Sequence, residues 1–156
     1  MQQYTNELTP ELRESSSQPP YDKDFLASCD SKTRGEYENF NQQVSRPVTH
    51  IFRFAVVGSV TRNGGVIRNV SGSSTAGGYK MARVGDKVVY ADGSEATIIS
   101  GAGGARIMQG ASAALVGSML ENGDEIISTS QSGSRLVFRE GDRFPNGFLA
   151  MPGSKH

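Results

Sequence analysis

The stretch from Met81 to Gly101 decides the fold, and it reads MARVGDKVVYADGSEATIISG. Side chains alternate along residues 84–90 as they do in a half-buried strand. An Asp92-Gly93 pair follows, and it favours a two-residue turn because both central positions of that turn need a positive φ. The stretch therefore predicts one β-hairpin, with a return strand at residues 96–99.

The same pattern occurs twice more, at residues 54–67 (FAVVGSVTRNGGVI) and at residues 113–127 (AALVGSMLENGDEII). A repeat of ~30 residues that cannot bury its own apolar face predicts that the three copies pack around a shared axis. The first glycines of the copies are Gly58, Gly85 and Gly117. The turn residues are Asn63, Gly64, Asp92, Gly93, Asn122 and Gly123.

The composition argues against several classes of protein. The 156 residues carry 16 basic and 16 acidic side chains, and this balance does not favour nucleic-acid binding. The single cysteine, Cys29, excludes an internal disulfide framework. No apolar run approaches the ~20 residues that span a bilayer, and the N-terminus lacks the features of a signal peptide. We therefore expect a protein that is made and kept soluble in the cytoplasm, and any export would need a dedicated machine.

The chain divides near residue 50, because every one of its 19 glycines except Gly35 lies after that point. Such glycine spacing leaves little room for ordinary helices, so short strands and tight turns are expected. We predict an extension at residues 1–50, the hairpin repeats at residues 51–133, and a strand and tail at residues 134–156. Within the last segment, residues 135–139 predict the strand and residues 140–142 its turn.

The first 50 residues are predicted to be partly helical or disordered. Thr9 is a candidate N-cap with Pro10 at the first helical position. Asp24 is expected to cap a second helical stretch, which Gly35 is expected to split. Pro47 closes the extension.

A stripe of apolar residues runs along this second stretch at roughly helical spacing. It has two interpretations: packing against the protein's own β-domain, or a docking face for a separate protein. Cys29 is expected to be a small apolar contact on the stripe. The candidate cargo-docking residues are Phe25, Tyr37 and Phe40.

Two glycine-rich segments, residues 72–78 and 101–104, lie between the hairpins. A phosphate-binding loop would need a Gly-Lys-Ser/Thr ending and a helix after it, and neither is present. We expect both segments to turn tightly or to allow close backbone approach.

Residues 80–86, KMARVGD, resemble the signature of the PAAR family, which is named for its Pro-Ala-Ala-Arg stretch and usually continues with Val-Gly-Asp. Met81 stands where the family often has alanine. Residues 112–117, SAALVG, look like a second, degenerate copy. The resemblance covers residues 51–133 and does not extend to residues 1–50. The repeat-motif residues are Ala82, Arg83, Gly85 and Asp86, with Gly58 and Gly117 in the other copies.

The resemblance implies an all-β fold, a small conical domain of three pseudo-threefold hairpin repeats, preceded here by the extension. Members of the family cap and sharpen the trimeric valine-glycine repeat spike of the bacterial type VI secretion system, and extensions carry or recruit effectors. The protein would then wait in the bacterial cytoplasm and be delivered with the spike to the periplasm, the extracellular space or a target cell. The alternatives are a tip of a related contractile injection machine or phage tail, and an adaptor whose extension binds cargo.

The resemblance also implies where the partner binds. A trimeric spike ends in three related strand edges, and three hairpins of one chain can pair with all three. We expect one chain per spike trimer, with the turn residues nearer the apex. The expected spike-binding residues are Val56, Val57, Val84 and Val116.

One departure from the family concerns metal. Many members hold an ion near the apex with three histidines and one cysteine, whereas the matching turn regions here offer Asn63, Tyr90 with Asp92, and Asn122. None of these can form a closed nitrogen-sulfur zinc site. The histidines, His50 and His156, and Cys29 lie elsewhere in the sequence. We expect neither a metal nor another cofactor.

An enzyme is the main rival class. With histidine only at positions 50 and 156, a catalytic triad would have to recruit a linker or a terminal residue. A carboxylate pair for glycoside cleavage is conceivable, but several candidates flank a turn, where charged residues usually face water. Asp86 more plausibly fixes a local turn or pairs with Arg83. We predict no catalytic residues. The carboxylates considered were Asp86, Glu95, Glu121, Asp124 and Glu125.

Overall fold

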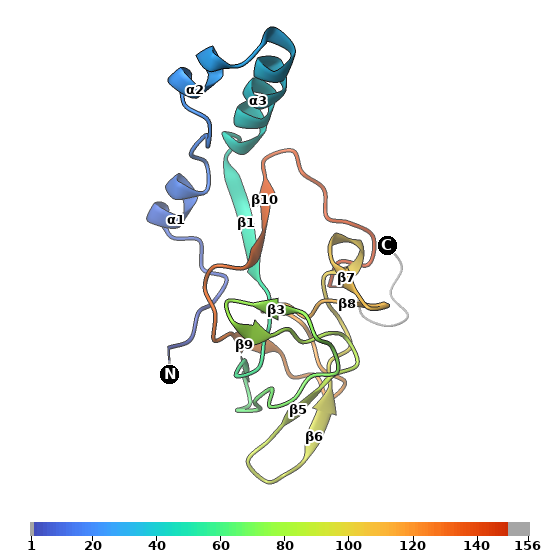
Figure 1. The fold of residues 1–156 in the computed structure, drawn as a ribbon. Helices are drawn as coiled ribbons and strands as arrows, with labels where there is room; N and C mark the ends of the chain where they lie inside the picture. Colours follow the sequence, from blue (N-terminus) through green and yellow to red (C-terminus); the bar gives the residue numbers. More distant parts are fainter. Residues whose placement is uncertain (1, 150–156) are drawn as a thin grey trace. The chain divides into compact units, whose positions relative to one another are not determined.

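The computed structural model describes residues 2–149, which divide into two compact units (Figure 1). Unit 1 consists of residues 2–6, 51–136 and 143–149, and unit 2 of Glu7–His50 and Val137–Asp142. This division differs from the predicted segments at both ends of the chain, and residues 134–136 and 143–149 join the hairpins instead of forming a separate segment. Residues 2–6 group with the hairpins, and residues 137–142 group with the helices.

Unit 2 contains the helices α1 (Pro10–Ser15), α2 (Lys23–Ser28) and α3 (Ser31–Val44). Thr9 caps α1, because its hydroxyl accepts a hydrogen bond from the Leu12 N–H at 3.1 Å. Pro10 occupies the start of this helix, where a missing N–H costs nothing. Both features confirm the prediction for this helix.

The cap of α2 differs from the prediction. Asp22, rather than Asp24, precedes the helix, and its carboxylate accepts the Phe25 N–H at 2.8 Å. A capping side chain reaches the N–H two or three residues ahead, so the earlier aspartate claims this donor. Asp24 instead lies in the first turn, where its charge complements the helix dipole.

The predicted split at Gly35 is also wrong, because α3 continues through this residue. A glycine inside a helix costs only ~1 kcal/mol relative to alanine, and a cap can offset that amount. The helical stretch breaks earlier, at Cys29, and Asp30 caps α3 by accepting the Thr33 N–H at 2.8 Å.

The apolar stripe forms a cluster of aromatic rings within unit 2. Tyr21 lies at its centre, with its ring centroid 4.4 Å from that of Tyr37 and 5.3 Å from that of Phe25. The Asn41 side chain holds Tyr21 in place by bonding both its backbone N–H and its C=O. Phe25 and Phe40 remain 42% and 50% exposed. The rings therefore pack on one another and still present an apolar surface.

The strands are short and pair two by two, as β1–β10, β2–β9, β3–β4, β5–β6 and β7–β8. The chain is thus rich in small β-hairpins, as the sequence predicts. The bounds are β1 Val48–Arg53, β2 Val60–Thr61, β3 Thr75–Ala76, β4 Tyr79–Lys80, β5 Lys87–Val89, β6 Glu95–Thr97, β7 Ile107–Met108, β8 Ala111–Ser112, β9 Ile126–Ser128 and β10 Arg135–Arg139, with a 3₁₀ turn, η1, at Gly103–Ala105.

The hairpin that decided the sequence interpretation is present as β5–β6. The two strands run antiparallel with Val88 opposite Ala96. The Tyr90 N–H donates to the Ser94 C=O at 2.8 Å, and three residues lie between them. Gly93 has a positive φ of 85°, whereas Asp92 does not. The predicted two-residue turn is therefore wrong, and the hairpin has a three-residue loop with glycine at the position that needs a positive φ. Val88 and Ala96 are buried, so the alternation along this stretch does separate an inner from an outer face.

A second hairpin precedes each of the last two copies, and the sequence interpretation missed both. Gly77-Gly78 turns between β3 and β4, and Gln109-Gly110 turns between β7 and β8. The four φ angles are 60°, 87°, 52° and 88°, which are the positive values that a tight primed turn requires. The similarity of these two hairpins is not evident from the sequence, because Gln109 occupies the position that Gly77 occupies in the other hairpin.

Hydrogen bonds between three alanines link the copies of unit 1. Ala55 donates to the Ala114 carbonyl at 2.9 Å, Ala114 donates to the Ala82 carbonyl at 3.0 Å, and Ala82 donates to the Ala55 carbonyl at 3.0 Å. These bonds close a ring in which each copy donates to one neighbour and accepts from the other. All three alanines are fully buried, so a larger side chain at these positions has no space.

The first glycine of each copy has the same local geometry. Gly58, Gly85 and Gly117 have φ angles of 97°, 100° and 105°, which other residues rarely adopt. Each donates its N–H to an isoleucine carbonyl on its own return strand at 2.8–2.9 Å. The repeated Val-Gly pair therefore marks the sharp bend that opens each hairpin. The acceptors are Ile67, Ile98 and Ile126.

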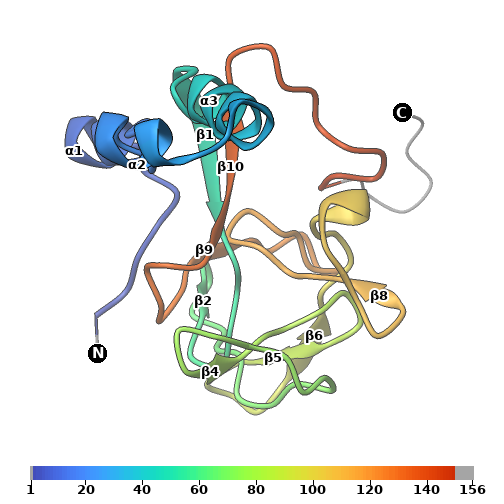
Figure 2. The same ribbon diagram turned by 45° about the horizontal axis from the view of Figure 1, so that its top comes forward.

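The core of unit 1 lies between the hairpins. The three acceptor isoleucines are fully buried and share one cluster with Val88 and Leu120. In Figure 2, β2 and β9, β5 and β6, and β8 lie on different sides of this unit. Over residues 2–149, the helices are too short and too polar for any of them to cross a membrane.

Candidate functional site

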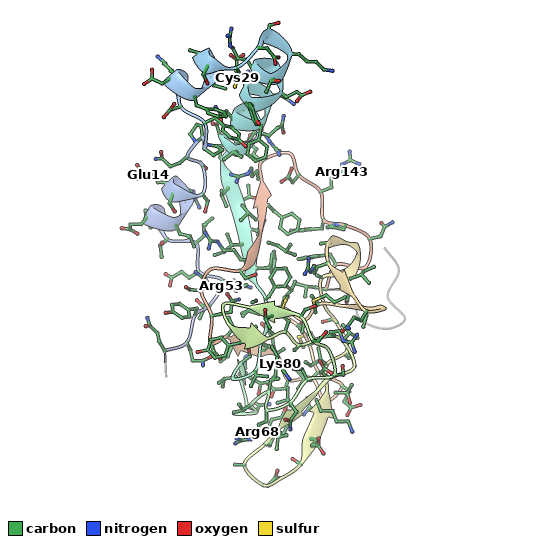
Figure 3. The ribbon with its side chains drawn as sticks, in the orientation of Figure 1. Glu14, Cys29, Arg53, Arg68, Lys80 and Arg143 are labelled. Carbon is green, nitrogen blue, oxygen red and sulfur yellow. The ribbon has the colours of Figure 1, made fainter. Side chains whose placement is uncertain are left out.

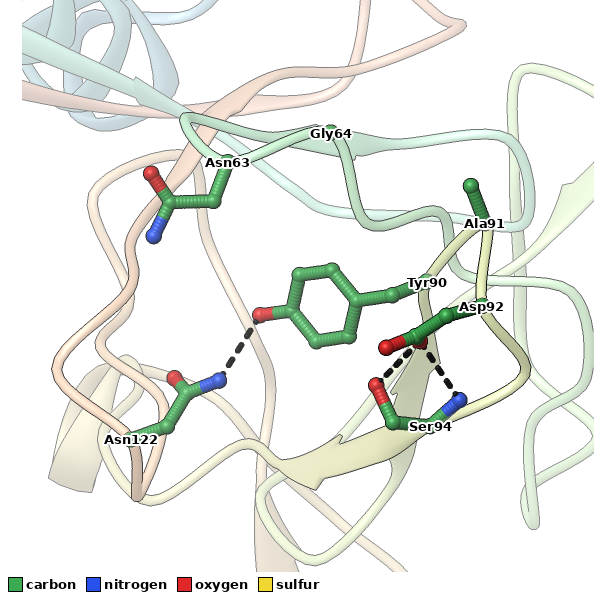
Figure 4. Close-up of a pocket in the computed structure, with 7 residues that line it drawn as sticks. All are labelled: Asn63, Gly64, Tyr90, Ala91, Asp92, Ser94 and Asn122. Atoms are coloured by element: carbon green, nitrogen blue, oxygen red, sulfur yellow. Dashed lines mark hydrogen bonds between the residues drawn. The ribbon is translucent and has the colours of Figure 1, made fainter.

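The three predicted turns line one hollow at the tips of the hairpins (Figure 4). Residues of all three copies contribute to it: Asn63 and Gly64 from the first, Tyr90 from the second, and Asn122 from the third. The hollow has a volume of about 460 Å³ and is open to solvent. The structure therefore brings together the turn regions that the sequence identified as apex candidates.

Tyr90 and Asp124 connect the tips from inside. The Tyr90 hydroxyl donates to the Asp124 carboxylate at 2.6 Å and accepts from the Asn122 amide at 3.0 Å. The other oxygen of Asp124 accepts the backbone N–H groups of Asn63 at 3.2 Å and Glu125 at 2.8 Å. One buried carboxylate thus joins all three hairpins.

The environment of this pair fixes its protonation. Burial of Asp124 acts to raise its pKa, but hydrogen bonds from Thr61, Tyr90 and two backbone N–H groups outweigh burial and lower that pKa. Burial raises the pKa of the Tyr90 phenol, and the neighbouring Asp124 charge adds to the effect. At neutral pH the carboxylate is therefore ionised, and the phenol keeps the proton that it donates.

The chemistry of the hollow is that of amide, hydroxyl and carboxylate oxygens. Asp92 accepts the Ser94 hydroxyl at 2.6 Å and the Ser94 N–H at 2.9 Å, and these bonds lower the pKa of Asp92. No group of three histidine, cysteine or acidic side chains converges on a metal position within residues 2–149. His156 lies outside these residues, and the expectation of a metal-free apex stays a prediction.

Two of the other acidic candidates for catalysis make structural contacts, and the third is exposed to solvent. Glu125 forms an ion pair with Arg62 at 2.9 Å. Glu121 accepts the Thr97 N–H at 3.3 Å. Glu95 is exposed on β6. Glu121 and Glu125 therefore have structural roles, because each contacts a neighbouring hairpin.

The repeat-motif residue Asp86 fixes a local turn. Its carboxylate accepts the Arg83 N–H at 2.9 Å and the Ser71 hydroxyl at 2.6 Å. Ser59 and Ser118 perform the same task in the other copies, where their hydroxyls accept a backbone N–H three residues earlier. Two roles were predicted for Asp86, and the structure shows the first of them, the fixing of a local turn.

The Arg83 side chain reaches the missed hairpin β7–β8. Its guanidinium donates to the Met108 and Gln109 carbonyls, each at 3.0 Å, and to the Ser71 hydroxyl at 2.7 Å. The arginine of the motif therefore binds the second copy to the turn that leads into the third. Ala82, in contrast, contributes through its backbone and its small size.

The four valines predicted to bind the spike differ in exposure. Val56 and Val116 are buried, whereas Val57 and Val84 are half-buried. The Val84 N–H donates to Ser112 at 2.9 Å, and Val57 and Val116 make equivalent bonds. The spike contact of these valines stays a prediction.

A feature that the sequence did not reveal is the N-terminal segment, residues 3–6, which runs along the third copy. Tyr4 and Thr129 exchange backbone hydrogen bonds of 2.8 and 2.9 Å. Asn6 accepts the Arg53 N–H and donates to the Val116 carbonyl, both at 2.8 Å. The segment is polar and has no periodicity, so no local signal could have identified it.

Comparison with known proteins gives one match. Residues 57–128 match the family model for the PAAR motif. No curated protein and no solved structure matches the chain. The matched range includes the first glycine and the turn of every copy, as well as the Tyr90–Asp124 contact.

Proposed function

Because residues 57–128 of this chain are a PAAR-motif segment, we propose that the protein is a non-enzymatic tip that caps and sharpens the trimeric valine-glycine repeat spike of a type VI secretion machine. The motif supports a spike-tip role in such a system, and the family consists of structural tip proteins that associate with spikes. The particular spike and the mode of capping are our proposal.

The observation that carries the proposal is the closed ring of Ala55, Ala82 and Ala114. Three copies that donate and accept in rotation support a pseudo-threefold cone. A chain with this internal symmetry can offer similar sides to three identical spike subunits, whereas two chains cannot share one axis. The Tyr90–Asp124 contact supports a firm apex, because it ties the hairpin tips together.

Unit 2 is proposed to attach an effector or its chaperone. Phe25 and Phe40 are exposed around Tyr37, and exposed aromatic surface of this kind is typical of protein contacts. Under this proposal the protein waits in the bacterial cytoplasm and leaves with the spike. A tip of a related contractile machine remains the second candidate, since the same threefold argument applies there.

The test is capture of the full chain by a purified trimeric spike. A spike that lacks its terminal turn serves as the matched control, because it has the same body without the end to be capped. We expect retention by the intact spike only, and retention that survives moderate salt, since backbone pairing and apolar fit depend little on ionic strength. Failure of the intact spike to retain the chain contradicts the proposal.

A further inference from the structure

The three copies have one more equivalent position, just after each return strand. The isoleucines that accept the glycine N–H groups set the register of the copies. Three residues beyond them lie Val70, Gly101 and Thr129 in the first, second and third copy. These three positions differ in what covers them.

Two of the three positions are covered by the terminal segments of the chain. Thr129 exchanges two backbone hydrogen bonds with Tyr4, in the manner of an added antiparallel strand. The Gly101 carbonyl accepts the Leu149 N–H at 2.7 Å. A terminal segment therefore hydrogen-bonds to the main chain at this position in both copies, as an added strand at Thr129 and as a turn at Gly101.

The first copy has no such cover within residues 2–149. The backbone groups of Arg68, Asn69 and Val70 make no hydrogen bond among the described residues. An exposed edge of unpaired N–H and C=O groups is a template for another strand. An open hollow of about 370 Å³ lies beside it. Its lining consists of Val57, Arg68, Asn69, Val70, Gly78, Tyr79 and Lys80.

The side chains around the hollow indicate the chemistry of an occupant. Arg68 and Lys80 are exposed, and no acidic residue lines the hollow. Both cations are labelled on this unit in Figure 3. Val57, Val70 and Tyr79 supply half-buried apolar surface between them. Two cations beside an apolar hollow favour an occupant with an apolar and an acidic side chain.

We propose that Arg68–Val70 and the adjoining hollow bind an extended segment of a partner protein that carries carboxylate side chains. The segment pairs with the main chain of Val70 as Tyr4 pairs with Thr129. Its apolar side chain packs against Tyr79, and a carboxylate lies against Arg68 or Lys80. This inference does not require that the chain caps a spike, so the two proposals can fail separately.

The test uses the full chain, labelled with ¹⁵N, and two short synthetic peptides of equal length. One peptide alternates valine with glutamate, and the other alternates valine with lysine. We expect the acidic peptide to shift the amide resonances of residues 68–70 and 79–80, and to bind at least about tenfold more tightly than the basic one at low salt. Equal affinities, or shifts that avoid residues 68–70, overturn the proposal.

Charge reversal separates this site from general attraction. Arg68→Glu and Lys80→Glu should each weaken the acidic peptide about three- to tenfold. Arg106→Glu is the matched control, because Arg106 is also exposed in unit 1 but does not line the hollow. It should leave the affinity within about twofold. A loss in Arg106→Glu as large as that in Arg68→Glu contradicts the proposed site.

Discussion

The Tyr90 hydroxyl donates to the Asp124 carboxylate at 2.6 Å, and this contact ties the second hairpin to the third. Asp124 is only 2% exposed, so water cannot readily replace the phenol. The Tyr90 hydroxyl also accepts from the Asn122 amide, which gives the ring a second contact with the turn of the third hairpin. The tip of unit 1 therefore depends on a small polar network.

Removal of the phenol tests this network. Tyr90→Phe should lower the free energy of unfolding by about 1–3 kcal/mol, because it leaves a buried carboxylate oxygen with fewer donors. Tyr79→Phe is the matched control, since Tyr79 is half-buried and its hydroxyl makes no hydrogen bond to any residue from 2 to 149. Denaturant unfolding gives both values. Equal losses in the two variants would show that the Tyr90–Asp124 contact does not stabilise the tip.

Acid should weaken the tip through Asp124. Because the pKa of Asp124 is lowered in the folded protein, its contribution is present above the ordinary aspartate pKa of ~3.9 and is lost as the pH falls through the folded value. Asp124→Asn should therefore be less stable than the wild type at pH 7 and should lose less stability on acidification. Unfolding at several pH values between 2 and 7 measures this difference.

Glu95→Gln provides the comparison for the acid experiment, since Glu95 is an exposed carboxylate on β6. We expect its acid profile to follow that of the wild type. If Asp124→Asn and the wild type lose stability in parallel below pH 4, the carboxylate does not stabilise the folded state as inferred.

The N-terminal segment should contribute to the stability of unit 1. Asn6→Ala leaves the buried Arg53 N–H and the Val116 carbonyl without their partners, and we expect a loss of about 1–3 kcal/mol. Asn69→Ala, at an exposed position, should change the stability by less than about 0.5 kcal/mol. Thermal unfolding measures both losses. A loss in Asn6→Ala no larger than that in Asn69→Ala would show that the N-terminal segment does not stabilise unit 1.

A proline on the side of the second copy should disrupt both fold and capping. Val84→Pro removes the N–H that donates to Ser112, and the expected cost is about 3 kcal/mol or more. Ala91→Pro lies in an exposed turn, and the Ala91 N–H donates no hydrogen bond within residues 2–149, so this variant should fold and bind the spike normally. A Val84→Pro protein that still caps the spike would contradict the expected importance of this edge.

Much of unit 1 could be predicted because short-range signals coincide with its geometry. The Asp-Gly and Asn-Gly pairs predicted where the chain turns, because glycine easily adopts the positive φ that a turn needs. The Val-Gly pairs indicated the repeat, but the sharp bends that they form were not predicted. The hairpin β7–β8 was missed because Gln109 adopts a positive φ, which glutamine rarely does and which the sequence therefore does not indicate. Similarly, nothing local marks Asp124 as the carboxylate that joins the tips.

The helices of unit 2 were predicted less accurately for a different reason. Two aspartates, Asp22 and Asp24, could each cap α2, and local propensity alone does not choose between them. The continuity of α3 through Gly35 depends on the whole helix, because packing of its aromatic face offsets the glycine. Caps and breaks are thus decided by contacts that extend beyond a few residues.

The stoichiometry of the spike complex tests the central claim most directly. Native mass spectrometry of the full chain with a trimeric valine-glycine repeat spike counts both components in one measurement. We predict one chain per three spike subunits, because the ring of Ala55, Ala82 and Ala114 already supplies three related sides within one chain. A complex with three chains per spike trimer would contradict this account.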